Sequence, residues 1–174
     1  WLTDHPIDNP SEETFEWLEV LKSVENTDGK FVFVELGAGF GRWALRAYKA
    51  CLFNNINPKN IKLIVAEAEP QHVVWLTEHL AHNEVPANSY ILTDALVSNY
   101  NGVGELLVHG PEGLAGTHTA KNWYGQSQTN SSNSEEILIK DIYLGKELLV
   151  DKQGRGKVVC DTLTIESILE QVEV

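Results

Sequence analysis

Short, almost continuous apolar runs recur in the first part of the chain, at 31–36, 61–68 and 89–96. Each run is rich in β-branched or aromatic side chains, which is typical of strands in a parallel sheet. The stretch "FVFVEL" at 31–36 has so little polar interruption that we expect its strand to be covered on both faces.

Before and between these runs, apolar residues recur at helical spacing, which predicts helices at 9–24, 41–54 and 69–83. In the first of these helices, we expect Phe15, Leu18 and Leu21 to face the core. Successive strand–helix units pair their strands in parallel through right-handed crossovers. The pattern therefore predicts an α/β fold with a doubly wound, mainly parallel sheet between two layers of helices.

The second part of the chain has a different character, with shorter strands predicted at 102–110, 137–144 and 156–163 and a closing helix at 164–172. The polar, low-complexity stretch at 126–136 predicts a mobile loop. We expect residues 1–174 to form a single domain that begins with a helical segment at 1–30.

Three glycines, Gly37, Gly39 and Gly41, separate the strand at 31–36 from the helix that follows it. In an open parallel sheet, ligands bind beyond the carboxyl ends of the strands, and glycine there permits positive φ angles and a close approach to the ligand. The spacing predicts a cofactor loop. Arg42 stands where a dinucleotide fingerprint needs a small residue, and no Lys-Ser/Thr pair follows, so NAD and ATP both fit poorly.

The stretch "ELGAGFG" resembles the first motif of class I S-adenosylmethionine-dependent methyltransferases. "IVAEAEPQHVVWLTEHLAHN" resembles the second motif and is closer still to the FkbM-type members, and "LTDAL" resembles the adenine-side motif. The resemblance covers roughly 31–172 and implies a Rossmann-like fold in three α/β/α layers, with S-adenosylmethionine as cofactor.

Carried over residue by residue, the resemblance assigns to the cofactor Glu35, Gly37, Ala38, Gly39, Gly41, Glu67, Glu69, Asp94 and Ala95. Glu35 and the loop would hold its methionine end, and Asp94 with the Ala95 backbone would face the adenine edge. Glu69 would accept hydrogen bonds from the ribose hydroxyls. Glu67, whose structural reading is a solvated charge at the strand end, remains an alternative ribose ligand because it lies on the same side of the strand.

The resemblance implies direct methyl transfer to a hydroxyl oxygen of a small molecule or sugar, with no metal and no assigned catalytic base. Two other functions stay open: an NAD(P)-binding oxidoreductase and a non-catalytic interaction module. The family's sheet has seven strands, whereas this chain stops where the fourth would begin and contains no Met, so we expect either a fragment or a sheet that is completed differently. An incomplete sheet would expose a strand edge through which copies of the chain could pair.

Composition narrows the partners and the compartment. The net charge of −12 disfavours nucleic-acid binding, and no apolar run is long enough to span a membrane. We expect Cys51 and Cys160 to be buried thiols, which together with the absence of a signal-peptide pattern predicts a cytoplasmic protein. The histidines of the helix at 69–83 lack a zinc-binding pattern and are expected to be solvated: His72, His79 and His82.

Overall fold

The computed structural model describes residues 12–108, 137–151 and 156–171. The predicted loop at 126–136 and the beginning of the predicted segment 1–30 lie outside these ranges. Among the described residues, no helix combines the length and the apolar character that a membrane span requires.

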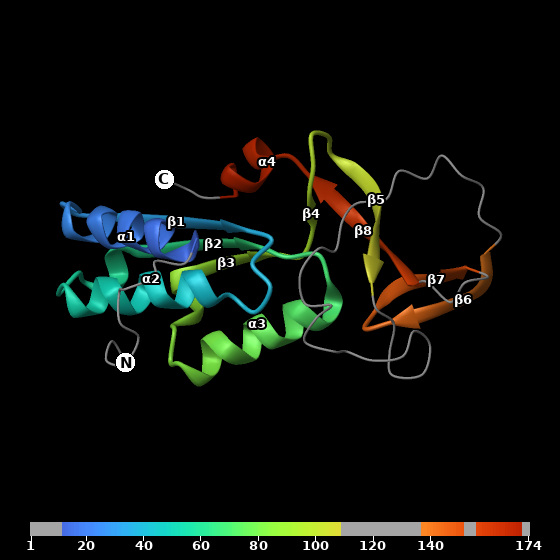
Figure 1. Ribbon diagram of the computed structural model, residues 1–174, viewed down its shortest axis with the longest axis horizontal. Helices are drawn as coiled ribbons and strands as arrows, with labels where there is room; N and C mark the ends of the chain where they lie inside the picture. Colours follow the sequence, from blue (N-terminus) through green and yellow to red (C-terminus); the bar gives the residue numbers. More distant parts are fainter. Residues whose placement is uncertain (1–11, 109–136, 152–155, 172–174) are drawn as a thin grey trace.

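Three parallel strands in the order β1-β2-β3 form the first sheet. They are β1 (Phe31–Leu36), β2 (Ile61–Ala66) and β3 (Tyr90–Thr93). All three strands predicted for the first part of the chain are confirmed, although β2 and β3 end short of the predicted bounds. The carboxyl ends of these strands point toward the second part of the molecule (Figure 1).

Helices lie on both faces of this sheet: α1 (Glu12–Glu25), α2 (Arg42–Phe53), α3 (Pro70–His82) and α4 (Ile165–Leu169). α2 and α3 bury their apolar sides against one face, in a core that contains Ala47 of α2, Leu63 of β2 and Leu76 of α3. The short helix α4 lies against the other face, where Ile168 packs on Ile64. Short 3₁₀ turns, Pro58–Asn60 and Ala87–Ser89, lead into β2 and β3.

The second sheet is mostly antiparallel, and this differs from the expected mainly parallel arrangement. It contains β4 (Leu96–Val97), β5 (Gly102–Val108), β6 (Ile137–Tyr143), β7 (Lys146–Asp151) and β8 (Gly156–Leu163). The strand β8 is central: β5 pairs along one edge, while β7 and then β4 pair along the other. Of the strands that pair with β8, only β4 is parallel to β8, and β4 follows β3 directly along the chain.

Sequence patterns missed β7 because the turn before it is unusual. Leu144 and Gly145 both have positive φ, 48° and 88°, and they join β6 to β7 in a tight hairpin. Two-residue hairpins of this kind normally carry Asn-Gly or Asp-Gly, because leucine is strained at positive φ. With Leu144 in place of Asn or Asp, the sequence lacks the usual hairpin signal.

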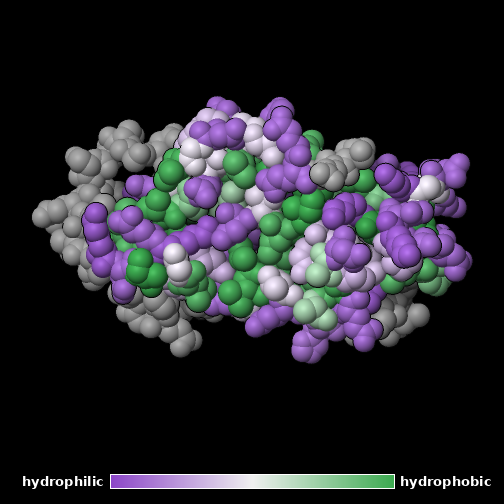
Figure 2. All heavy atoms as spheres, turned by 180° about the vertical axis from the view of Figure 1, so that it is seen from behind, coloured by the Kyte–Doolittle hydropathy of each residue, from purple (hydrophilic) through white to green (hydrophobic). Residues whose placement is uncertain are grey.

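The strand β1 is covered on one face only, so the expectation of cover on both faces is wrong. On the open face Val32, Val34 and Leu36 are 49%, 38% and 40% exposed. The short helix α4 covers the neighbouring β2 on that face and leaves β1 open. Among the described residues, β1 pairs with β2 alone, so no described strand pairs with its other edge. Pairing of two copies of the chain through this edge stays a prediction. On the face seen in Figure 2, hydrophobic side chains form several patches between hydrophilic ones.

The helix α1 packs through a different stripe from the one predicted. Phe15 and Leu18 are 65% and 45% exposed, so they do not face the core. Trp17, Val20 and Val24 share a face at helical spacing, and they contact Trp43 and the core instead. Both stripes fit a helical period, and the stripe that contains Trp17 is the one that packs against Trp43 of α2.

We expect the two faces of the first sheet to differ in how much stability a buried hydroxyl group costs, and valine-to-threonine substitutions measure that cost. We expect Val65→Thr, on β2, to lower the free energy of unfolding by about 1–3 kcal/mol, because its hydroxyl would be buried. Val65 is 0% exposed, whereas Val34 is 38% exposed. Val34→Thr should therefore cost about 0.5 kcal/mol or less. Urea unfolding monitored by tryptophan fluorescence measures both, and equal losses would contradict an open face on β1.

Both cysteines are buried, as predicted, and neither forms a disulfide. Cys51 lies on the core side of α2, and Cys160 of β8 packs in the core of the second sheet. Burial raises the pKa of both thiols, to about 11 for Cys51. These thiols are therefore packing groups and poor nucleophiles at neutral pH.

Candidate functional site

A pocket of about 440 Å³ lies at the carboxyl ends of β1 and β2 and continues toward the second sheet. The β1–α2 loop, the residues after β2, the first turn of α3, and β4 with Leu106 of β5 form its walls. Its volume falls within the range of small-molecule and cofactor sites. It lies where ligands of parallel α/β sheets bind.

The structure brings most of the predicted cofactor residues to this pocket: Glu35, Gly37, Ala38, Gly39, Glu67 and Ala95. Gly41, Glu69 and Asp94 lie outside its lining.

The glycine loop requires glycine because all three of its glycines have positive φ. The angles are 71° at Gly37, 57° at Gly39 and 72° at Gly41, a region that other residues adopt only with strain. The N–H groups of Gly37 and Ala38 both donate to the Ala66 carbonyl, at 2.9 and 3.0 Å, so the loop folds across the end of β2.

Glu35, at the end of β1, turns its carboxylate to the start of α2. The Ala44 N–H donates to Oε2 at 2.7 Å, and the Trp43 N–H lies 3.4 Å from Oε1. These are amides at the helix N-terminus that lack partners within the helix. Burial raises the pKa of Glu35 to about 7, although these two amides and Arg42 act in the opposite direction.

Glu67 follows β2 and accepts three backbone amides, one from the glycine loop and two from the residues that follow Glu67. Oε2 accepts the Gly39 N–H at 2.6 Å, and Oε1 accepts the N–H groups of Ala68 and Glu69 at 2.9 and 2.8 Å. The residue is only 7% exposed, so the expected solvated charge is wrong. Burial by itself would raise its pKa, but His72 and the amides of Glu69 and Gly39 outweigh it and lower the pKa.

Glu69 is the N-cap of α3 and is 2% exposed. Its Oε2 accepts the His72 N–H at 2.7 Å, and Pro70 occupies the first turn, as is usual at helix starts. Burial raises the pKa of Glu69, while the interaction with the Tyr143 hydroxyl of β6 opposes the rise. Of the two candidate ribose ligands, Glu67 faces the pocket, and Glu69 caps a helix behind it.

Asp94 and Ala95 separate in their roles. Ala95 is 3% exposed and lines the pocket. The Asp94 carboxylate instead accepts from Lys146 at 2.6 Å, and this ion pair ties the β6–β7 hairpin to the end of β3. The side chain of Lys146 is 17% exposed and that of Asp94 is 46% exposed, so the ion pair between the two sheets is partly open to solvent.

The sequence patterns did not place several of the pocket residues there, among them the polar or aromatic side chains of Arg42, Trp43 and His72. Arg42 pairs with Glu13 of α1, and its guanidinium lies 5.7 Å from the centre of the Trp43 ring. His72 is 6% exposed, so the expectation of a solvated imidazole is wrong for it. A usable signal was its place in the first turn of α3, where side chains lie beside the N-cap.

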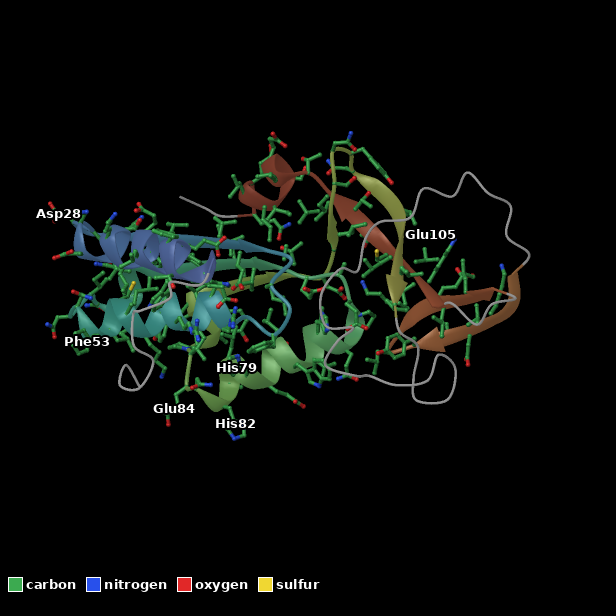
Figure 3. The ribbon with its side chains drawn as sticks, in the orientation of Figure 1. Asp28, Phe53, His79, His82, Glu84 and Glu105 are labelled. Carbon is green, nitrogen blue, oxygen red and sulfur yellow. The ribbon has the colours of Figure 1, made fainter. Side chains whose placement is uncertain are left out.

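The other histidines of α3 have separate environments. His79 is half-buried, and its Nδ1 lies 2.8 Å from the carbonyl of Phe40 in the glycine loop. His82 is exposed and points away from the ribbon (Figure 3). Within the described ranges, no group of three or more His, Cys, Asp or Glu side chains is arranged to hold a metal ion.

Comparisons with protein-family models, with curated proteins and with solved structures found no match to this chain.

Proposed function

We propose that this chain is an S-adenosylmethionine-dependent methyltransferase domain of Rossmann-like, doubly wound type, which methylates a hydroxyl oxygen of a small molecule or sugar. One observation carries the proposal. The Gly39 N–H donates to Glu67 Oε2 at 2.6 Å, so a positive-φ glycine loop and a buried strand-end carboxylate meet in one pocket. That pairing, at the carboxyl end of a parallel sheet, is the chemistry that a nucleoside with an amino-acid tail requires.

The residues of the pocket fit that cofactor. Gly37 has no atom within 4 Å of the place where a Cβ would lie, so the loop leaves room for a ligand beside its backbone. A carboxylate offers about four acceptor positions. Backbone amides occupy three on Glu67, which leaves room on Oε2 for one ribose hydroxyl. Ala95, Leu96 and Leu106 supply an apolar wall for a flat base.

When bound, S-adenosylmethionine supplies a methyl group already activated by its sulfonium. The protein then has to hold the donor and align an acceptor oxygen behind the methyl carbon. The loop at 37–41 and Glu67 are rigidly bonded to each other and to β2, which favours fixed placement of the nucleoside. We assign no residue to proton removal from the acceptor.

Isothermal titration with S-adenosylhomocysteine tests the proposal. We expect micromolar binding by the wild type and at least tenfold weaker binding by Glu67→Gln, about 1.4 kcal/mol. Glu67→Gln keeps the size of the side chain but removes the charge that accepts the hydroxyl. Glu78→Gln, an exposed carboxylate on α3, is the matched control and should leave the dissociation constant unchanged.

Glu69→Gln separates the two strand-end acids. Because Glu69 caps α3 outside the pocket lining, we expect this variant to lose about 1 kcal/mol of stability and little affinity. A loss of affinity at Glu69 that exceeds the loss at Glu67 would return the ribose to Glu69. No heat from a folded wild type would overturn the proposal, and heat with NADH in its place would favour the oxidoreductase.

A further inference from the structure

A buried cluster of three ionisable side chains includes Glu67 and His72 of the pocket wall and Glu69 behind it. Their exposed fractions are 7%, 2% and 6%. We propose that His72 is a positioning residue for Glu67: its imidazole, set between the two carboxylates, keeps Glu67 charged and turned toward Gly39, so that ligand binding depends on His72. The role in ligand binding rests on the proposed function, whereas the action on Glu67 does not.

The imidazole faces both carboxylates at once. Nδ1 lies 3.8 Å from Glu67 Oε1, and Nε2 lies 3.9 Å from Glu69 Oε2. These distances are longer than hydrogen bonds and within the range of a strong electrostatic interaction inside a protein. The backbone N–H of His72 donates to Glu69, and its ring stacks on Trp75 with centroids 5.5 Å apart. The ring is therefore held from two sides.

Charge explains why the cluster needs His72. Two carboxylates that are two residues apart and almost fully buried repel each other and lose their hydration, and both effects favour protonation. Within the described part of the chain, the ion-pair partner found for both Glu67 and Glu69 is His72. The His72 imidazole turns one ring nitrogen toward each carboxylate and adds a polar partner beside the three backbone amides that Glu67 accepts.

The neighbouring charges identify Glu67 as the acid that responds to His72. Burial raises the pKa of both acids, but the His72 side chain is the main group that brings the pKa of Glu67 down. Among the described residues, Tyr143 of β6 acts on Glu69, Glu35 of β1 lies close enough to interact with Glu67, and Arg42 lines the pocket and acts on Glu35. Burial raises the pKa of Glu35 to about 7.

Carbon-13 NMR of the side-chain carboxyl groups tests the action on Glu67 without any ligand. Comparison with Glu67→Gln assigns its resonance. We expect His72→Leu to move the Glu67 titration to higher pH by about one pH unit or more, because burial is no longer offset. His72→Gln, which keeps a polar side chain but removes the imidazole ring, should move it in the same direction and serves if the leucine variant does not fold. An unmoved Glu67 titration would overturn the proposal.

Titration with S-adenosylhomocysteine at several pH values then tests the consequence for binding. We expect the affinity of His72→Leu to be within about threefold of the wild type at pH 8 and to weaken progressively relative to the wild type as the pH falls through the raised Glu67 titration, as protonated Glu67 stops accepting. His82→Leu, exposed on the same helix, should match the wild type at every pH. In the Glu67→Gln background, His72→Leu should add no further loss.

The outcomes separate this inference from the proposed function. Suppose that the wild type binds and that His72→Leu weakens binding by the same factor at every pH. His72 then only fills space. The same conclusion follows if His72→Leu weakens binding as much in the Glu67→Gln background as in the wild type. A wild type that fails to bind overturns the methyltransferase proposal, while the NMR titration still decides whether His72 acts on Glu67.

Discussion

Replacing Gly41 with alanine is expected to lower the free energy of unfolding by about 2–4 kcal/mol. Two effects combine at this position, the residue before α2. The φ angle of 72° strains any residue that carries a Cβ. An added Cβ would also lie 3.1 Å from Cγ of Leu76, which is fully buried in the core of α3 and cannot retreat easily.

Gly37→Ala is the matched control for that substitution. Gly37 has almost the same φ, 71°, but a Cβ there would meet nothing within 4 Å. It should therefore cost only the backbone strain, about 1 kcal/mol. Urea unfolding of both variants measures the difference, which is the cost of crowding Leu76. Equal losses would mean that the α2–α3 contact yields without cost, contrary to a tightly packed core.

Much of the first sheet could be predicted because each of its strands is a short apolar run bounded by polar turns. Phe31–Leu36 forms β1 with the predicted bounds. The apolar run could not indicate which face of β1 would be covered. Hydrophobic residues tend to be buried, but their sequence does not say which other element will pack on them. The cover depends on the short helix α4, which is distant in sequence and reaches β2 but not β1.

The candidate site was predictable to the level of its segments and less so to the level of single side chains. The two-residue alternation places Glu67 and Glu69 on the same side, so the alternation alone cannot choose between them. The choice follows from the start of α3 at Pro70, which turns Glu69 into a cap and leaves Glu67 facing Gly39. The preference of proline for the first helical position, applied to "EAEP", would have indicated that Glu69 immediately precedes α3.

The polar contacts between the two sheets could not be predicted from the sequence. Lys146 meets Asp94, and Tyr143 meets Glu69, across large separations along the chain. Both contacts come from the β6–β7 hairpin, whose turn carries no recognisable signal. Asp94 therefore has a structural partner that a motif-based assignment to adenine does not anticipate.

Glu35 is expected to make the stability of the protein depend on pH between about pH 5 and pH 8. Its folded-state pKa of about 7 lies above the ordinary value of 4.5, because burial disfavours the charged form. The folded protein therefore binds this proton more tightly than the unfolded chain does. The corresponding stabilisation is complete below pH 4.5 and is lost as the pH rises through about 7, up to about 3 kcal/mol in all.

Glu35→Gln removes this titration while its amide oxygen can still accept the Ala44 N–H. Other acids contribute to the wild-type profile, so the measurement is the difference in unfolding free energy between the variant and the wild type at each pH. We expect that difference to move in favour of Glu35→Gln by about 2–3 kcal/mol from pH 5 to pH 8, in urea titrations. Glu78→Gln, exposed on α3, should give a flat difference. A flat difference for Glu35→Gln as well would mean that the amides at the start of α2 stabilise the charged carboxylate fully. In that case the charge of Glu35 would be a permanent feature of the pocket at physiological pH.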